Sequence, residues 1–339
     1  MPKDRPTRSR WRWVLRALVL LVALAVALLV WANVSPWPST YVIRTVFDAG
    51  GRTIARKLAP HVPKQGLAEA RDVQYDATDR DAKLDIFHPQ GAVPRTTIVW
   101  IHGGGHVAGK KEEIANYLRI LASKGYGVVG IEYTRAPDAH YPVPVEQANR
   151  ALGWLSANAP RYGLSRDRFV LAGDSAGAQI AAQLANIVTS PKYARDLSIR
   201  PSIDPARLVG AVLFCGPFDA QLTIPQDGGE PSWFIRSVMW AYMGRKDFRS
   251  DPRVAGYSVA RFVTKDFPPA FISVGNDDPL QAHSYLMADQ LRAQGVPVDV
   301  LFWPRDHAPA LPHEYQFDLD SAEGAEALRR TEAFLAGLK

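Results

Sequence analysis

The stretch RFVLAGDSAGAQIAAQLA, residues 168–185, decides how this 339-residue chain folds. Residues 168–172 form a short, mostly apolar run typical of a β-strand, and residues 178–185 are rich in helix-forming residues. Between them, residues 173–177 match G-x-S-x-G, a pattern that presents a serine on a sharp turn from a strand into a helix. Glycines on both sides of the serine allow the close backbone packing of such a turn. The pattern therefore indicates that Ser175 is a candidate nucleophile.

A second strand followed by glycines lies upstream of this segment. Residues 96–101, TTIVWI, are β-branched and aromatic, which predicts a buried parallel strand. The strand runs directly into HGGGH at residues 102–106. Consecutive glycines after a core strand can turn backbone N–H groups toward a developing negative charge, as an oxyanion hole requires. We expect His102 and His106 to shape this glycine loop, and Asp174 to position the serine turn.

A serine nucleophile needs a histidine base and an acid that orients the histidine. On this kind of scaffold the acid follows the serine in the chain, and the histidine follows the acid. Residues 269–275 form a predicted strand, and Asp277 and Asp278 follow its carboxyl end, where open α/β sheets hold catalytic groups. We expect Asp278 to be the acid, with Asp277 as the alternative.

The candidate base comes from the next predicted strand, residues 298–303. The loop that follows, residues 304–307, carries His307. We expect His307 to be the base, because it lies close to the end of the strand. His313 is the alternative; it lies further along the chain and next to Pro312.

Together these motifs resemble those of the hormone-sensitive-lipase-like esterases, a group of the α/β-hydrolase superfamily. The resemblance rests on four motifs and one histidine: HGGG at 102–105, YTRAPDAHYPVP at 133–144, GDSAG at 173–177, DPL at 278–280, and His307. It covers roughly residues 70–335, and it departs after the histidine, where the family has His-Gly-Phe and this chain has His-Ala-Pro. It implies an α/β-hydrolase fold, in which a mostly parallel central sheet is flanked by helices and carries a helical cap.

By this resemblance the chain is a serine hydrolase that cleaves carboxylic esters with short to medium acyl groups through an acyl-enzyme. Ser175 would attack the ester carbonyl, His307 would take the serine proton, and Asp278 would hold the imidazole. The implied oxyanion hole consists of three backbone N–H groups, those of Gly104, Gly105 and Ala176. This mechanism requires no metal and no organic cofactor. The alternatives are an amidase or acyltransferase with the same triad, and a non-catalytic ligand-binding protein on a hydrolase scaffold.

Other kinds of site and partner find little support in the sequence. It contains neither H-E-x-x-H nor G-x-x-x-x-G-K-[ST], and its single cysteine, Cys215, excludes a zinc site built from several cysteines. Cys215 ends a predicted strand, residues 208–215, where we expect it to be a small buried apolar residue. The net charge is +6, but residues 1–16 carry +5 of it from six basic residues and one acidic residue. The rest of the chain is close to neutral, so we expect no nucleic-acid partner.

The amino-terminal segment predicts a transmembrane helix. Residues 17–32 carry no charge and consist mainly of Ala, Leu and Val, and a helix needs about 20 apolar residues to span a membrane. The basic residues before it should stay in the cytoplasm, which places the rest of the chain on the periplasmic or extracellular side. We therefore expect a basic cytoplasmic tail at residues 1–13 and an uncleaved signal anchor at residues 14–32. A cleaved signal peptide and a buried core helix are the alternatives.

The remaining residues are expected to form a linker with cap helices at 33–70 and a catalytic domain at 71–339. Strands and helices alternate along the domain, as in the predicted strand 126–133 between helices, which favours a parallel sheet. Residues 217–266 interrupt this alternation and are rich in aromatic residues and methionine. We expect this cap insertion and residues 33–70 together to cover the active site and control access to it. Most of its aromatic side chains are expected to pack the cap onto the domain.

Overall fold

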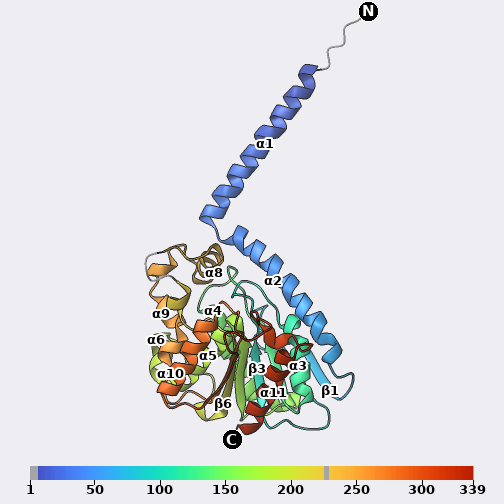
Figure 1. Cartoon of the computed structure of the whole chain (residues 1–339), viewed down its shortest axis with the longest axis vertical. Coiled ribbons are helices and arrows are strands. Elements are labelled where there is room, and N and C mark those ends of the chain that lie inside the picture. Colours follow the sequence, from blue (N-terminus) through green and yellow to red (C-terminus); the bar gives the residue numbers. More distant parts are fainter. Residues whose placement is uncertain (1–6, 225–228, 339) are drawn as a thin grey trace, which may run out of the picture.

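The centre of the molecule is an eight-stranded β-sheet in the computed structural model, which describes residues 7–224 and 229–338 (Figure 1). The order of the strands in the sheet is β1-β2-β4-β3-β5-β6-β7-β8. β1 pairs antiparallel with β2 and β2 pairs antiparallel with β4, whereas all the pairs among β3 to β8 are parallel. The strands are β1 (Leu67–Gln74), β2 (Lys83–Pro89), β3 (Thr97–Ile101), β4 (Gly127–Ile131), β5 (Phe169–Asp174), β6 (Leu208–Phe214), β7 (Ala270–Val274) and β8 (Val298–Phe302).

The parallel part of the sheet corresponds to the six strands that the sequence predicts, and the mostly parallel α/β architecture is confirmed. β1 and β2 were not among the predicted strands. β1 has the sequence LAEARDVQ, which lacks an apolar run, and its side chains are half-buried or exposed because it lies at the edge of the sheet. An edge strand of this kind carries little of the hydrophobic pattern that identifies a core strand.

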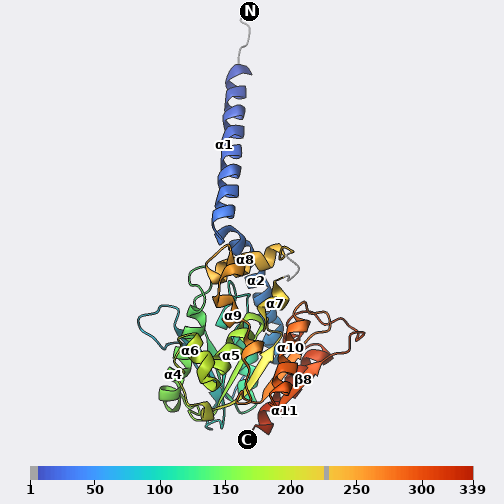
Figure 2. The same cartoon turned by 90° about the vertical axis from the view of Figure 1, so that its left-hand side faces the viewer.

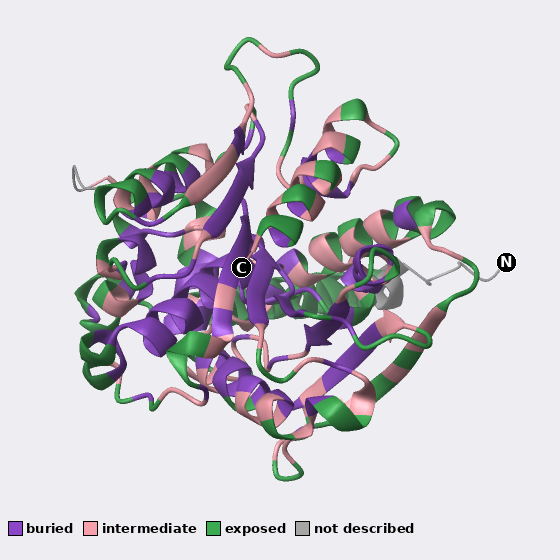
Figure 3. Ribbon diagram, turned by 90° about the horizontal axis from the view of Figure 1, so that it is seen from below, coloured by how far each residue is buried: buried purple, intermediate pink, exposed green. Residues whose placement is uncertain are grey.

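Helices cover both faces of the sheet. Val99 and Ile101 of β3 belong to the core that includes α4, α5 and α10, and Ile98 and Trp100 belong to the core that includes α3 and α11. This division follows from the alternation of side chains along a strand. Figure 3 shows the buried strands enclosed by helices that expose their outer surfaces. The helices of the domain are α3 (Lys111–Ser123), α4 (Val143–Asn158), α5 (Ser175–Thr189), α6 (Pro191–Asp196), α10 (Gln281–Ala293) and α11 (Ala322–Gly337).

Further helices lie near the carboxyl edge of the sheet. They are α2 (Trp37–Leu58), α7 (Ala220–Thr223), α8 (Trp233–Met243) and α9 (Arg253–Tyr257). Arg44 docks α2 on the domain, because its Nε donates to the carbonyl oxygen of Val107 at 2.6 Å and its Nη2 to that of Ala136 at 2.8 Å. Residues 225–228 of the expected cap insertion lie outside the described residues. Short 3₁₀ helices occupy Ala59–His61, Ala159–Tyr162, Pro205–Arg207, Phe248–Ser250, Val259–Phe262 and Tyr315–Phe317.

A long helix, α1 (Thr7–Val34), extends away from the domain (Figures 1 and 2). Within it, Trp11–Val34 is long and apolar enough to cross a membrane, and none of its apolar stretch is buried. A signal sequence meets the same description. A core helix would be buried, so this placement argues against that alternative. Residues 1–6 of the expected basic tail lie outside the described residues.

Candidate active site

Ser175 occupies a sharp turn between β5 and α5. The strand ends at Asp174 and the helix begins at Ser175, whose φ of 51° lies in the left-handed region that residues with side chains rarely adopt. Gly177 lies so close to β3 that a Cβ at this position would stand 2.0 Å from the carbonyl oxygen of Ile101. Glycine is therefore required there, as the sequence pattern indicates. The turn holds Ser175 at the carboxyl edge of the sheet, and such backbone strain is common at functional sites.

His313 and Asp278 lie in line with the hydroxyl group of Ser175. Nε2 of His313 is 2.9 Å from Oγ of Ser175, and Nδ1 is 2.8 Å from Oδ2 of Asp278. A proton donated from Nδ1 to the carboxylate leaves Nε2 free to accept the serine proton. Burial disfavours the imidazolium form, but the hydrogen bond to the Asp278 carboxylate favours it, and the pKa of His313 lies well above its ordinary value. This arrangement can activate a serine as a nucleophile.

The structure places His307 away from Ser175. Nε2 of His307 lies 3.0 Å from Oε1 of Glu323 on α11, and its ring packs against Trp303 with the centroids 4.4 Å apart. The expected pairing of His307 with Ser175 is therefore wrong in this structure. His313, the alternative, is the histidine that faces the serine.

Hydrogen bonds between two loops explain the position of His313. The N–H of Asp277 donates to the carbonyl oxygen of Leu311 at 3.1 Å, and the N–H of Leu311 donates to Oδ1 of Asn276 at 2.8 Å. These bonds hold the segment before His313 against the turn that follows β7, so the imidazole meets Asp278. The number of residues after the end of β8 therefore does not predict which histidine reaches Asp278, because the loop returns toward the turn after β7.

One signal in the sequence distinguishes the two histidines. The family pattern His-Gly-Phe has an aromatic residue two positions after the histidine, and HEY at residues 313–315 keeps this aromatic residue whereas HAP at 307–309 lacks it. The structure shows why the aromatic residue matters. Tyr315 is buried, and its hydroxyl lies 2.8 Å from Oγ of Ser273 on β7, which ties the histidine loop to the sheet.

The structure brings Asp278, rather than Asp277, to the histidine. The side chain of Asp278 is buried, and its Oδ1 accepts a hydrogen bond from the N–H of Leu280 at 2.7 Å while Oδ2 faces His313. Asp277 is exposed. The additional hydrogen bond fixes the orientation of the Asp278 carboxylate, which in turn fixes that of the imidazole.

The glycine loop borders the same cavity as Ser175. Gly104 has a φ of 109°, and a Cβ at this position would stand 2.1 Å from the carbonyl oxygen of Ala108. Ala176 is the second residue of α5, where a backbone N–H has no partner within its own helix. Gly104, Gly105 and Ala176 all line the cavity. The three candidate oxyanion donors and the candidate nucleophile therefore share one space.

Asp174 joins the serine turn to the glycine loop. Its Oδ1 accepts a hydrogen bond from Nε1 of Trp100 at 2.7 Å, and its Oδ2 accepts one from the N–H of Gly103 at 2.8 Å. Its carboxyl group also interacts with that of Glu314, a contact that the sequence did not predict. Burial raises the pKa of Asp174, and burial together with the charge of Asp174 raises the pKa of Glu314 to about 7. Asp174 thus positions both loops next to a carboxyl group that titrates near neutral pH.

The two histidines of the glycine loop contact protein groups that hold the loop in place. Nε2 of His102 lies 3.1 Å from Oε1 of Glu132, and its ring stacks on Tyr133 with the centroids 4.4 Å apart. The ring of His106 stacks on Tyr242 of α8 with the centroids 3.9 Å apart. Burial lowers the pKa of His106 to about 3, so this imidazole is neutral. His106 thereby connects the glycine loop to the cap.

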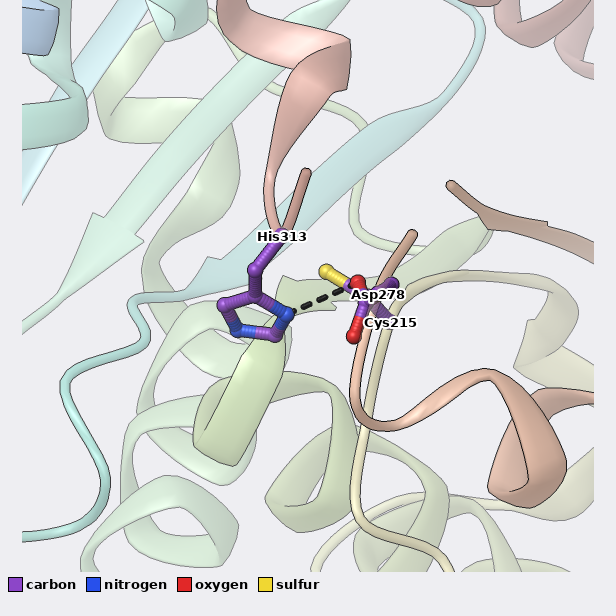
Figure 4. A group of neighbouring side chains, drawn as sticks. All are labelled: Cys215, Asp278 and His313. Atoms are coloured by element: carbon purple, nitrogen blue, oxygen red, sulfur yellow. Dashed lines mark hydrogen bonds and ion pairs between the residues drawn. The ribbon is translucent and has the colours of Figure 1, made fainter. Parts of the chain in front are cut away.

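Cys215 lies beside Asp278 and His313 (Figure 4). Donor atoms of the three residues lie within 4.8 Å of one another, close enough to hold a metal ion. Burial raises the pKa of the Cys215 thiol to about 11, which opposes the thiolate form that metals bind. The imidazole is also already engaged with the carboxylate and with Ser175. The cluster is therefore better suited to proton transfer than to metal binding.

A cavity of about 650 Å³ lies above Ser175, within the usual range for small-molecule sites. The glycine loop, Ser175 and His313 form its polar part. The opposite part is apolar and comes from α2 and α8, through side chains that include Val46, Phe47, Ile54, Phe234, Val238 and Met239. The arrangement can hold an apolar small molecule with a reactive group at the serine.

Comparisons with known proteins give consistent results. A family model described as alpha/beta hydrolase fold matches residues 98–310. An acetyl esterase of Salmonella paratyphi B is 28% identical over 231 residues, which make up 66% of this chain and 68% of that protein.

Solved structures are similar over most of the chain. Esterase B from Lactobacillus Rhamnosis (HN001) has a TM-score of 0.71 and 25% identity, covering 88% of this chain and 96% of that one. A hyperthermophilic esterase from the archaeon Pyrobaculum calidifontis has a TM-score of 0.67 and 21% identity, covering 98% and 97%, and shows a likeness of fold.

Proposed function

The chain belongs to the alpha/beta hydrolase fold family, and from this premise we propose that it hydrolyses carboxylic esters with Ser175, His313 and Asp278 as its catalytic triad. Its similarity to named esterases indicates a carboxylesterase-type hydrolase. The observation that carries the proposed triad is the continuous line of hydrogen bonds from Asp278 through His313 to Ser175, next to an apolar cavity.

In the proposed reaction His313 takes the proton of Ser175 while Oγ attacks the ester carbonyl. The Asp278 carboxylate stabilises the imidazolium that forms, and His313 then gives its proton to the leaving alcohol. A water molecule resolves the acyl-enzyme, with His313 again acting as the base. The N–H groups of Gly104, Gly105 and Ala176 would hold the oxyanion, and the loss of one such donor typically costs about 3–4 kcal/mol in the transition state.

The substrates that fit this proposal are esters with short to medium acyl groups. The cavity of about 650 Å³ offers an apolar wall for the acyl chain or the alcohol. No charged side chain of α8 lines it, since the lining residues from that helix are Phe234, Ile235, Val238 and Met239. The part of the cavity formed by α8 therefore suits an uncharged, apolar group of the ester, while Lys110 and Glu113 line another part.

We also propose that α1 anchors the enzyme in a membrane. Residues 1–13 would form the cytoplasmic tail, residues 14–32 the anchor, residues 33–70 the linker and cap helices, and residues 71–339 the catalytic domain on the non-cytoplasmic side. The support is the uncharged run within α1, its exposure, and the basic residues that precede it.

The proposed nucleophile is tested with a fluorophosphonate probe on the detergent-solubilised full-length protein. We expect the wild type to be labelled and Ser175→Ala to remain unlabelled and inactive toward p-nitrophenyl esters. Ser123→Ala, which changes an exposed serine at the end of α3, should be labelled like the wild type. Labelling or esterase activity that persists in Ser175→Ala would rule out Ser175 as the nucleophile.

A further inference from the structure

The first half of α2 exposes an apolar stripe. Tyr41, Val42 and Val46 are 64%, 55% and 62% exposed. Val42 and Val46 are neighbours on the helix surface because they are four residues apart, and Tyr41 directly precedes Val42. Further along α2 the exposed residues become basic, as Arg52 and Arg56 show. The apolar part of the exposed surface is therefore confined to the end of α2 that follows α1.

The cap also exposes apolar side chains. Leu222 on α7 is 48% exposed and Trp233 on α8 is 50% exposed. Outside α1, the described part of the chain exposes seven large apolar side chains, and five of them lie on α2 or in the cap insertion. We call these five residues the rim patch: Tyr41, Val42, Val46, Leu222 and Trp233.

The rim patch adjoins the carboxyl-terminal end of α1. Figures 1 and 2 both show α8 beside the start of α2, where α1 meets the domain. Nζ of Lys246, just beyond α8, donates to the carbonyl oxygen of Asn33 in the last turn of α1 at 2.8 Å. Lys246 also lies over the ring of Trp240, 5.3 Å from its centroid. A bilayer spanned by α1 would thus end at the level of α8.

Two residues of the rim patch lie at the cavity. Val46 and Leu222 are exposed, and both line the cavity. Just inside them, the rings of Phe47 on α2 and Phe234 on α8 lie 5.6 Å apart. A methyl group on Gly105 would stand 3.6 Å from each ring, so this aromatic pair lies directly over the glycine loop. An apolar path therefore leads from the surface near α1 to the candidate oxyanion site.

We propose that the rim patch rests on the bilayer that α1 spans, and that the enzyme takes uncharged lipid esters directly from this bilayer through the opening between α2 and α8. The proposal rests on the proposed esterase function and on membrane anchoring. A lipid surface is the occupant that fits, because the patch adjoins the end of an apolar helix of membrane length. Aromatic residues such as Tyr41 and Trp233 are enriched at the membrane–water interface.

The test uses the full-length protein reconstituted in phosphatidylcholine vesicles, with two substrates. One is water-soluble p-nitrophenyl acetate, and the other is didecanoylglycerol, a medium-chain ester, dissolved in the vesicles. The variant is Val42→Glu with Trp233→Glu, which changes two exposed residues that do not line the cavity. The matched control is Val93→Glu, because Val93 is 73% exposed and precedes β3 at the opposite edge of the sheet.

We expect the double variant to hydrolyse the vesicle-dissolved ester about tenfold more slowly, while its rate on p-nitrophenyl acetate stays within about twofold of the wild type. Val93→Glu should match the wild type on both substrates. An equal loss on both substrates, no loss on the vesicle ester, or the same loss in Val93→Glu would overturn the proposal. If the wild type hydrolyses neither ester and is not labelled by the fluorophosphonate, the proposed esterase function itself fails.

A second measurement reports on the contact with the bilayer and not on activity. Cys215 is buried, so a polarity-sensitive fluorophore can be attached to a cysteine introduced as Val42→Cys or Val93→Cys. The two labelled variants are compared in vesicles of the same composition. We expect a blue-shifted emission at position 42 and not at position 93. An emission wavelength at position 42 equal to that at position 93 would show that position 42 is in water, and it would overturn the docking of the rim patch on the bilayer.

Discussion

The cavity has two walls of different character. The carboxyl edge of the sheet carries Ser175, His313 and Asp278, whose polar atoms are held by hydrogen bonds between loops far apart in the sequence. The opposite wall is formed by α2 and α8, where apolar side chains such as Phe47 and Phe234 meet. The chemistry requires fixed geometry, whereas an apolar wall selects by shape and volume. Reaction and selection should therefore respond to different substitutions.

The largest effect is expected from the two histidines after β8. His313→Ala should lower kcat by at least about 10⁴-fold on all esters, because the serine loses its base. His307→Ala should keep kcat within about an order of magnitude, because His307 faces Glu323 and Trp303 instead of Ser175. Steady-state kinetics on p-nitrophenyl acetate compares them. A greater loss in His307→Ala would mean that the loop rearranges in the working enzyme.

Asp278→Asn should produce the next largest loss, about 10³- to 10⁴-fold in kcat. The neutral amide of Asn replaces the charged carboxylate that accepts the hydrogen bond from Nδ1. The imidazole therefore loses its orientation and its charge partner. Asp277→Asn is the matched control, because Asp277 is exposed and does not contact His313. Similar kinetics in the two variants would contradict the assignment of the acid.

A substitution on the apolar wall should change selectivity more than turnover. Phe234→Ala removes a ring that lies over the glycine loop. We expect kcat/KM for a medium-chain ester to change by about tenfold relative to that for the acetate. The ratio of kcat/KM values across a series of p-nitrophenyl esters provides the measurement, with the acetate as internal reference. A uniform loss across the series would mean that this wall also shapes the reacting geometry.

The smallest effect concerns the buried carboxyl pair beside the triad. In the folded protein the pKa of Glu314 is about 7, above its ordinary value of 4.5, because of burial and the charge of Asp174. The folded state therefore keeps a proton that the unfolded chain loses, and the free energy of unfolding should fall as the pH rises from about 4.5 to about 7. This stabilisation is fully present below pH 4.5 and is lost above pH 7.

Glu314→Gln should remove that part of the pH dependence. Urea unfolding of the wild type and the variant at pH 5 and pH 8 measures it, and we expect a smaller difference between the two pH values in the variant. An unchanged difference would show that other groups carry the pH dependence. Phe234 carries no titratable group, so Phe234→Ala should retain the wild-type pH difference.

Much of the fold could be predicted because its signals are local. The apolar runs of β3 to β8 and the glycines around Ser175 depend on backbone preferences and side-chain alternation over a few residues. β1 escaped prediction because its edge position leaves it polar. The sequence placed cap helices at residues 33–70 over the active site, but it did not predict the contacts that dock α2, in which Arg44 donates to the carbonyl oxygens of Val107 and Ala136.

Local sequence patterns are enough to place Ser175 on a strand–turn–helix, the glycine loop after β3, and an acid and a histidine after the last strands. Which histidine meets the serine depends on contacts between distant segments, because hydrogen bonds between the loops after β7 and β8 bring His313 to Asp278. The position of Glu314 against Asp174 also depends on such contacts. The physical reason is that local pattern sets the backbone of each element, whereas contacts between loops depend on how distant segments pack.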